Sequence, residues 1–194
     1  MNLLVAASDG SRRAVRDVNH LAAAARDGDR VALEQFVAAT QGDVWTFCAR
    51  MMGRHQADDL TQETFLRAIG TLRTFRGESS ALTWLLIVAR NTCVDTIRRE
   101  TRRRRIRDRL ARYGETGQDP VQPEQSVELE ELIERLSPDR RLAFVLTQTL
   151  GLSYDEAAEV CEVPIGTIRS RVARARQDLM AMLDDDSGGI TGVL

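Results

Sequence analysis

The chain has 194 residues, with 27 basic and 29 acidic side chains and a formal net charge of −2. This length fits one ordinary domain or two small ones. Its hydrophobic share of 43% and charged share of 29% are typical of folded proteins and exclude a wholly disordered chain. The aromatic share of 5%, without alternating β-branched runs, argues against a large β-sandwich or barrel.

Several functional classes have no support in the sequence. No run of about 18 apolar residues occurs, and the first residues lack the basic leader of a signal peptide, so we expect a cytoplasmic protein without membrane insertion. Cys48, Cys93 and Cys161 are far apart, which predicts free, buried thiols. No metal cluster, phosphate-binding loop or nucleophile–base pair is visible, so we expect no cofactor, no metal and no catalytic residue.

The first half predicts four helices in chain order. Helices over 18–27 and 30–52 flank a turn at Asp27-Gly28-Asp29, and Gly53 ends the second. A third helix covers 57–72, and a polar loop covers 74–80. Ser79 or Ser80 then caps a fourth helix that starts at Ala81 and continues into the arginines near 100.

The second half predicts a linker and a second helical unit. The segment 101–126 carries glycine and proline in place of apolar residues and is interpreted as a flexible linker. An apolar helical stripe then leads to Ser137-Pro138, which opens a helix that ends near Gly151. Ser153 and Glu156 form a capping box for a short helix to about Cys161, and Thr167 caps the last helix, to about Leu183.

The predicted fold class is therefore all-α, with two small helical domains over 18–100 and 127–184 and disordered ends at 1–17 and 185–194. Charge is segregated along this plan: Arg90 to Arg112 carries a net +7, and Glu115 to Asp139 carries −7. Such blocks are often solvated faces, although the arginines also suit phosphate binding. Because the two blocks cancel, the small net charge does not exclude a nucleic-acid partner.

The segment 153–177 follows the helix-turn-helix plan, in which a second helix enters the major groove of DNA. That helix separates into two faces. The apolar face is expected to contain Ile168, Val172, Ala175 and Leu179. The polar face, suited to base and phosphate contacts, is expected to contain Arg169, Ser170, Ala173, Arg174 and Gln177. A solvent-exposed amphipathic helix without a ligand is the alternative.

Two further patterns lie in the first domain. Asp59, Gln62, Glu63 and Leu66 share one helix face, which suits either protein docking or a solvated surface. Phe75, Arg76 and Asn91 lie around the buried run Leu82 to Ala89, in which Trp84 is expected in the core. Aromatic, amide and guanidinium groups together suit the recognition of an unstacked base.

Three motifs in this order resemble the extracytoplasmic-function sigma factors, nearest to the actinobacterial sigma C branch. They are Asp-Asp-Leu-Thr-Gln-Glu-Thr-Phe-Leu-Arg at 58–67, Thr-Trp-Leu at 83–85 with Ala-Arg-Asn at 89–91, and the helix-turn-helix segment 152–176. The resemblance implies a sigma-2 domain over 18–100, a sigma-4 domain over 127–184 and an acidic linker that mimics nucleic acid. It also implies a non-catalytic RNA polymerase subunit.

The resemblance assigns roles by position. Core polymerase docking on the β′ clamp helices falls to Asp59, Gln62, Glu63 and Leu66. Minus-ten recognition and melting falls to Phe75, Arg76, Ser79, Ser80, Trp84, Asn91, Arg98 and Arg99. Minus-thirty-five recognition falls to Thr167, Arg169, Ser170, Ala173 and Arg174, with Ala173 smaller than the residue that family members often carry. The implied partners are promoter DNA, the β′ clamp helices and β flap of core polymerase, and an anti-sigma factor.

Two other classes compete with this interpretation. A helix-turn-helix repressor or activator would bind duplex DNA alone, as a dimer on a palindrome, with the first domain as a sensing or dimerisation module. A DNA-acting enzyme such as a recombinase would need a catalytic constellation, which the sequence does not display.

Overall fold

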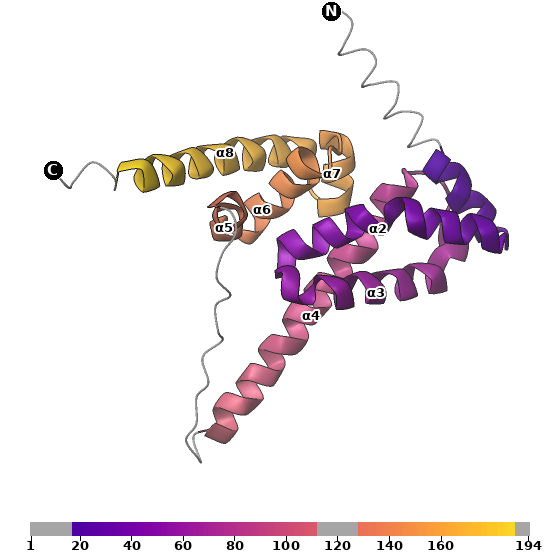
Figure 1. The fold of residues 1–194 in the computed structure, drawn as a ribbon, viewed down its shortest axis with the longest axis horizontal. Helices are drawn as coiled ribbons and strands as arrows, with labels where there is room; N and C mark the ends of the chain where they lie inside the picture. The colour runs from indigo at the N-terminus through magenta and orange to yellow at the C-terminus, as the bar shows by residue number, and fades with distance from the viewer. Residues whose placement is uncertain (1–16, 112–127, 189–194) are drawn as a thin grey trace, which may run out of the picture.

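The computed structural model describes residues 17–111 and 128–188, and these residues form helices and no strands (Figure 1). This confirms the all-helical prediction. A helix over 17–26 comes first. It is followed by α2 (Arg30–Met52), α3 (Arg54–Thr71), the 3-10 turn η1 (Leu72–Thr74), α4 (Ala81–Ala111), α5 (Glu128–Arg135), α6 (Pro138–Phe144), the π-helical turn η2 (Val145–Thr149), α7 (Tyr154–Cys161) and α8 (Ile165–Gly188). The predictions for 1–16, 112–127 and 189–194 lie outside the described residues.

Local hydrogen bonds explain where the helices of the first half begin and end. The Asp29 carboxylate accepts from the Val31 and Ala32 amides at 2.9 and 3.1 Å, after a turn in which Gly28 has φ +107°. At the end of α2, Gly53 has φ +88° and donates to the Ala49 carbonyl. The predicted turn and stop are therefore confirmed.

Serine residues mark two other helix starts as the sequence predicted. The Ser80 hydroxyl accepts from the Thr83 amide at 3.0 Å, so Ser80 is the cap of α4. Ser153 and Glu156 form the complete capping box of α7. Ser137 precedes Pro138 at the start of α6 but makes no capping hydrogen bond through its side chain.

Four predicted boundaries differ from the structure, including the start of α3, which lies at Arg54 and not at 57. The prediction of Thr167 as a cap is wrong: α8 starts at Ile165, and the Pro164 carbonyl accepts from the Thr167 amide at 2.8 Å. Helix α4 continues to Ala111, past the expected linker start at 101, since arginine is a good helix former that needs no core contact. Helix α8 likewise continues past 184 to Gly188.

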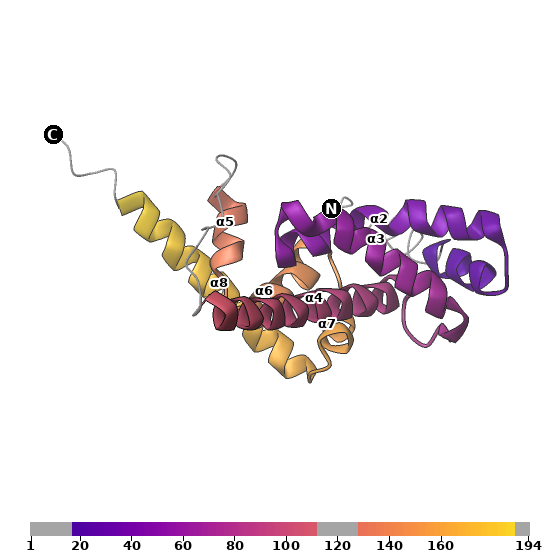
Figure 2. The ribbon, with the colours of Figure 1, turned by 90° about the horizontal axis from the view of Figure 1, so that it is seen from below.

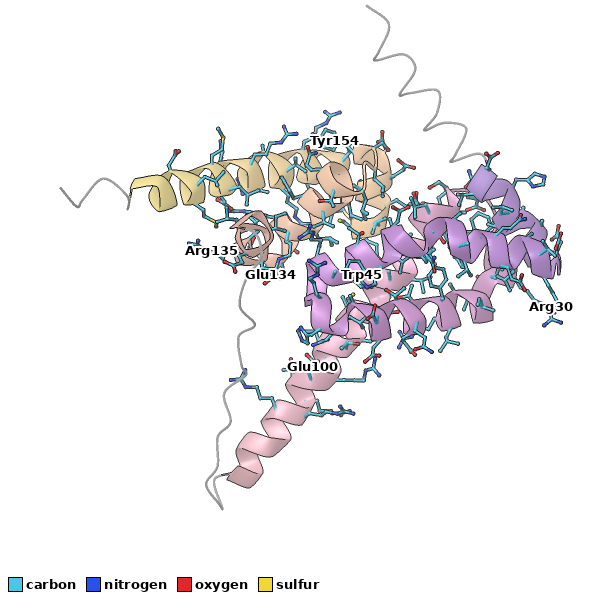
Figure 3. The ribbon with its side chains drawn as sticks, viewed as in Figure 1. Arg30, Trp45, Glu100, Glu134, Arg135 and Tyr154 are labelled. Carbon is cyan, nitrogen blue, oxygen red and sulfur yellow. The ribbon has the colours of Figure 1, made fainter. Side chains whose placement is uncertain are left out.

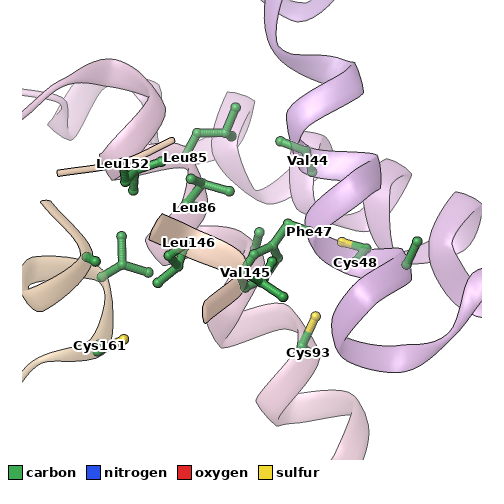
Figure 4. Packing of buried hydrophobic residues seen from close by; sticks show 14 of the residues in the cluster. Val44, Phe47, Cys48, Leu85, Leu86, Cys93, Val145, Leu146, Leu152 and Cys161 are labelled. Carbon is green, nitrogen blue, oxygen red and sulfur yellow. The ribbon is translucent and has the colours of Figure 1, made fainter. Parts of the chain in front are cut away.

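The two halves share one hydrophobic core. Helix α2 packs on α3 and α4, and α7 packs on α4 from the other side (Figure 2). Phe47 of α2 lies beside Val145 of η2, and both residues are buried, as is Val44 (Figure 4). The C-terminal parts of α4 and α8 extend beyond this core on the same side and diverge (Figure 1). The sequence did not predict this association of the two units.

Candidate protein-docking and nucleic-acid surfaces

The face of α3 that carries Asp59, Gln62, Glu63 and Leu66, here called the α3 stripe, faces away from the core. Asp59 and Gln62 are exposed, and Leu66 is 62% exposed despite its apolar side chain. The opposite face is buried and contains Leu60, Phe65 and Ala68. An exposed leucine among polar residues is the composition of a protein contact site, where an apolar centre is surrounded by polar groups.

Arg67 forms ion pairs that hold Glu63, a member of the α3 stripe, in place. Arg67 Nε donates to Glu63 Oε1 and Arg67 Nη1 donates to Asp95 Oδ2, each at 2.8 Å. The guanidinium lowers the pKa of the Asp95 carboxyl, chiefly through this hydrogen bond. Arg67 therefore joins α3 to α4, and sequence analysis missed this role because the Asp95 contact spans 28 residues.

Cavities flank the stripe on both sides. One of about 440 Å³ lies between α3 and α4 and includes Asp59, Glu63 and Arg99 among its lining residues. Another of about 570 Å³ lies between α2 and α3 and includes Trp45, Thr61 and Gln62. Trp45, labelled in Figure 3, donates from Nε1 to Asp58 Oδ1 at 2.7 Å. The docking candidates thus lie on a ridge between two hollows.

Phe75 does not lie where the sequence placed it. Its side chain is 4% exposed, and its ring centroid lies 5.5 Å from that of Trp84, with the planes at 52°. Its carbonyl accepts from Arg26 Nη1 at 3.3 Å. A buried ring has no free face for a base. Phe75 therefore packs the loop against α4 in this structure, and its role in a minus-ten pocket with Asn91 stays a prediction.

Helix α4 nevertheless presents a continuous open stripe. Trp84 is half-buried, whereas Asn91 and Arg98 are exposed. Successive members are seven residues apart, which places them on one face, about 10 Å apart along the axis. On the opposite side, Leu85 and Ala89 are buried. We call Trp84, Asn91 and Arg98 the open α4 stripe.

The remaining minus-ten candidates lie around this stripe. Arg76 is exposed in the loop before α4, and its Nη1 atom lies 3.9 Å from Glu78 Oε1. Ser79 is half-buried, and the Ser80 hydroxyl is occupied by capping. Arg99 is exposed and donates from Nη2 to the Thr96 hydroxyl at 3.1 Å. Arg76 and Arg99 are therefore the members with accessible charge, while Ser80 has a structural role.

Helix α8 confirms the predicted separation of faces. The apolar residues are buried, as the sequence indicated: Ile168, Val172, Ala175 and Leu179. The candidate contact residues are exposed, apart from Thr167, which is half-buried and accepts from the Ser170 hydroxyl at 2.9 Å. The exposed set is Arg169, Ser170, Ala173 and Arg174.

The arginines of α8 fall into two classes. Arg171 pairs with Asp139, and Arg176 Nη2 donates to the side-chain oxygen Oε1 of Gln148, each at 2.6 Å. In the described part of the chain, neither Arg169 nor Arg174 has a hydrogen-bond or ion-pair partner. The two unpaired guanidinium groups lie on the polar face and remain available to an external acceptor such as a base edge or phosphate.

The first helix of the helix-turn-helix contacts α4 directly. Arg90 Nη1 lies 3.1 Å from Glu162 Oε1, and the Thr83 hydroxyl donates to Glu156 Oε1 at 3.4 Å. Glu162 ends α7 in the left-handed conformation, with φ 56°. The α4 face that contains Thr83 and Arg90 is thus covered by α7 beside the open α4 stripe.

Among residues 17–111 and 128–188, no group of three or more histidine, cysteine or acidic side chains is arranged to hold a metal ion. In the same ranges, no helix is long and apolar enough to cross a membrane.

Both halves of the chain match known protein families. The model of Sigma-70 region 2 matches residues 36–104, and that of Sigma-70 region 4 matches residues 126–179. The ECF RNA polymerase sigma factor SigC of Mycobacterium tuberculosis is 48% identical over 171 residues, which cover 87% of this chain and 92% of that protein. The ECF RNA polymerase sigma-E factor of Escherichia coli is 34% identical over 163 residues, which cover 77% of this chain and 85% of that protein.

Solved structures agree with these sequence matches. CnrH in complex with the cytosolic domain of CnrY has a TM-score of 0.67 at 28% identity, covering 88% of this chain and 99% of that one. The sigma factor RpoE in complex with the anti-sigma factor NepR from Bartonella quintana has a TM-score of 0.64 at 29% identity, covering 78% and 96%. The chain therefore belongs to the extracytoplasmic-function sigma factors of the sigma-70 family.

Proposed function

We propose that this sigma factor, which directs core RNA polymerase to promoters, docks on the β′ clamp helices through the α3 stripe. The observation that carries the proposal is the exposure of Leu66 between Gln62 and Glu63, with Glu63 fixed by Arg67. A prearranged polar side chain beside an apolar anchor loses little conformational entropy on binding. The chain itself has no catalytic role, and RNA synthesis belongs to the polymerase.

The open α4 stripe is proposed to bind the melted minus-ten region. Trp84 and Asn91 offer a ring and an amide to an unstacked base, and Arg98 and Arg99 offer charge to backbone phosphates. Base flipping costs a few kcal/mol, which these contacts would offset. Phe75 contributes by holding Trp84 rather than by stacking on the base.

The second half is proposed to read the minus-thirty-five element in the major groove and to contact the β flap. Arg169 and Arg174 carry the base and phosphate contacts, because their guanidinium groups are exposed and unengaged among the described residues. Ala173 is small enough to pack against a thymine methyl group. An anti-sigma factor is also a proposed partner, and the cytoplasm, where core polymerase acts, is the proposed location.

Run-off transcription with core polymerase from a related bacterium tests the docking proposal. The Gln62→Ala/Glu63→Ala pair should weaken polymerase binding and reduce transcription from every promoter by a similar factor. The matched control is Glu34→Ala/Gln35→Ala, which changes an exposed acid and amide on α2. A promoter-selective defect in the first variant would contradict the docking role, as would an equal defect in the control.

The same assay separates a sigma factor from a repressor or activator. Promoter-specific transcripts should appear only when polymerase and protein are both present. Protection of a palindromic site by the protein alone, without any promoter-specific transcript, would favour the competing function.

A further inference from the structure

The helix over 17–26, here called the N-terminal helix, holds both ends of the loop that precedes α4. The Ala81 amide donates to Asn19 Oδ1 at 2.7 Å, and Arg26 Nη1 donates to the Phe75 carbonyl at 3.3 Å. These contacts join residues 62 and 49 positions apart in the sequence. Because Phe75 and Ala81 flank the segment 76–80, one helix fixes this segment at each of its ends.

The two contacts come from one face of the N-terminal helix. Asn19 and Arg26 are seven residues apart, which places their side chains on the same side, about 10 Å apart along the helix axis. Ala22 lies between them on that face and is fully buried. The helix therefore packs closely against the first half of the molecule and presents one hydrogen-bonding side chain on each side of the packed alanine.

Asn19 caps α4 from a distant part of the chain. The first four amides of a helix have no acceptor within the helix. The Ser80 hydroxyl accepts from the Thr83 amide, and the Asn19 side chain accepts from the Ala81 amide. Ala81 is 0% exposed, so loss of the Asn19 oxygen would leave a buried donor without an acceptor. Asn19 therefore helps to fix where α4 begins, close to Trp84 in its first turn.

The Arg26 guanidinium is itself held in one orientation. Its Nε and Nη2 donate to the two carboxylate oxygens of Asp27 at 2.8 and 3.3 Å, while Nη1 donates to the Phe75 carbonyl. The planar guanidinium fixes these three donors relative to one another. Since the Phe75 ring packs on Trp84, Arg26 holds the backbone of a residue that contacts the open α4 stripe.

Between its two fixed ends the loop is open to solvent. Arg76, Gly77 and Glu78 are exposed, and Gly77 has φ +73°, which favours glycine. The side chains of Arg76 and Glu78 are 81% and 80% exposed, so their ion pair adds little rigidity. The position of these exposed groups therefore depends on the contacts at Phe75 and Ala81.

We propose that Asn19 and Arg26 are positioning residues for minus-ten recognition, through which the N-terminal helix sets the place of the loop and of Trp84. This inference rests on the proposed minus-ten role of the loop and the open α4 stripe. Neither residue has to touch DNA. Base recognition depends on the placement of the contacting groups more than phosphate attraction does, so loss of these contacts should reduce discrimination between minus-ten sequences.

Hydrogen exchange tests the structural part of the proposal without polymerase. In full-length Asn19→Ala, peptides that cover Phe75 to Trp84 should exchange faster than in wild type, whereas peptides from α3 should not change. The matched control is Asp29→Ala, which removes the side-chain cap of α2 and leaves both loop contacts in place. Unchanged exchange in the loop of Asn19→Ala, or an equal increase in the control, would overturn the proposal.

Transcription by core polymerase from a promoter library randomised at the minus-ten element measures the effect on recognition. Asn19→Ala and Arg26→Ala should each lower discrimination against single-base changes about tenfold, within the range of a lost base contact. Polymerase affinity and discrimination at the minus-thirty-five element should stay at wild-type values, and Asp29→Ala should keep wild-type discrimination at both elements. An equal loss at both elements would indicate general destabilisation and overturn the positioning role.

Conservative variants separate the hydrogen bonds from other effects of truncation. Asn19→Asp keeps an acceptor oxygen for the Ala81 amide, and Arg26→Lys keeps a donor for the Phe75 carbonyl. Both should retain most of the minus-ten discrimination that the alanine variants lose. If Asn19→Asp discriminates no better than Asn19→Ala, the hydrogen bond to Ala81 does not position the loop.

Arg76→Ala and Asn91→Ala distinguish this inference from the proposed function on which it rests. If both variants keep wild-type minus-ten discrimination, the proposed minus-ten surface is wrong and the positioning role fails with it. If both lose discrimination while Asn19→Ala and Arg26→Ala do not, the minus-ten surface stands and only the positioning role is overturned.

Discussion

Helices α4 and α8 carry the candidate DNA contacts, but their surroundings differ. Helix α8 has one buried face, which includes Ile168 and Val172, and an opposite face open to solvent. Helix α4 has a buried face at Leu85, a face against α7 at Arg90, and only the open α4 stripe between them. A helix that reads duplex DNA needs one free face, whereas α4 also connects the two halves of the molecule.

This difference predicts how far the effect of a substitution extends through the molecule. A change on the polar face of α8 removes one contact and leaves the fold intact. A change on the inner faces of α4 acts on the core shared by both halves. Substitutions in the core of α4 should therefore affect stability more than substitutions on the exposed face of α8.

Leu86→Ala should have the largest effect. Leu86 is fully buried on α4, in the region where it approaches Leu146 (Figure 4). Removing a buried leucine side chain costs about 2–5 kcal/mol. Urea unfolding followed separately in each half should show both halves losing stability in a single transition. Leu66→Ala is the control and should change stability little, since Leu66 is 62% exposed. Destabilisation confined to the first half would contradict a shared core.

Arg174→Ala should weaken the use of promoters that depend on the upstream element, by about 1–3 kcal/mol for a lost base contact. Folding should be unaffected, because Arg174 is exposed and has no partner among the described residues. Transcription from promoters with and without a minus-thirty-five element measures the effect.

The control for Arg174→Ala is Arg176→Ala, which removes the same charge from the same helix. Its guanidinium is held by Gln148, so it is not expected to contact DNA. Equal defects in the two variants would indicate general charge loss rather than base recognition.

The structural features that depend only on residues near in sequence were predictable. The capping box at Ser153 and the two faces of α8 were predictable because both follow from spacing within one helix. The all-helical class followed in the same way. The α4 end at Ala111 was not predicted, because an arginine-rich run was interpreted as part of a linker although its residues favour a helix.

The sequence could not predict contacts between distant segments. Phe75 was expected to face a base, but the loop folds its ring onto Trp84. The bridge from Arg67 to Asp95 and the pair Arg90–Glu162 join residues 28 and 72 positions apart. Such contacts depend on how helices pack, which helical periodicity does not specify. The candidate site was therefore predictable as a set of helix faces but not as a set of exposed groups.

Breaking the Arg90–Glu162 pair should have a small effect. The Glu162 side chain is 67% exposed, and exposed ion pairs contribute about 0–1 kcal/mol. A double-mutant cycle with Arg90→Ala and Glu162→Ala, measured by urea unfolding, should give a coupling energy in this range that decreases with added salt. A coupling above about 2 kcal/mol would show that this pair, rather than the apolar core, holds α7 on α4.

Asp43→Asn should produce the smallest change, in the pH dependence of stability. Asp43 is half-buried and lines a cavity of about 250 Å³ with Ser80 and Glu156, where α2 and α4 meet the second half. Burial raises the pKa of its carboxyl above the unfolded value of about 3.9. Between the unfolded and the folded pKa, the folded state therefore binds more protons than the unfolded state. The ionised Asp43 carboxylate consequently opposes folding at neutral pH. This opposition decreases as the pH falls through the folded pKa.

Thermal unfolding from pH 7 to 4 should show that Asp43→Asn stabilises the protein slightly at pH 7 and loses this advantage on acidification. A stabilisation that is equal at every pH would exclude the carboxyl charge as its cause.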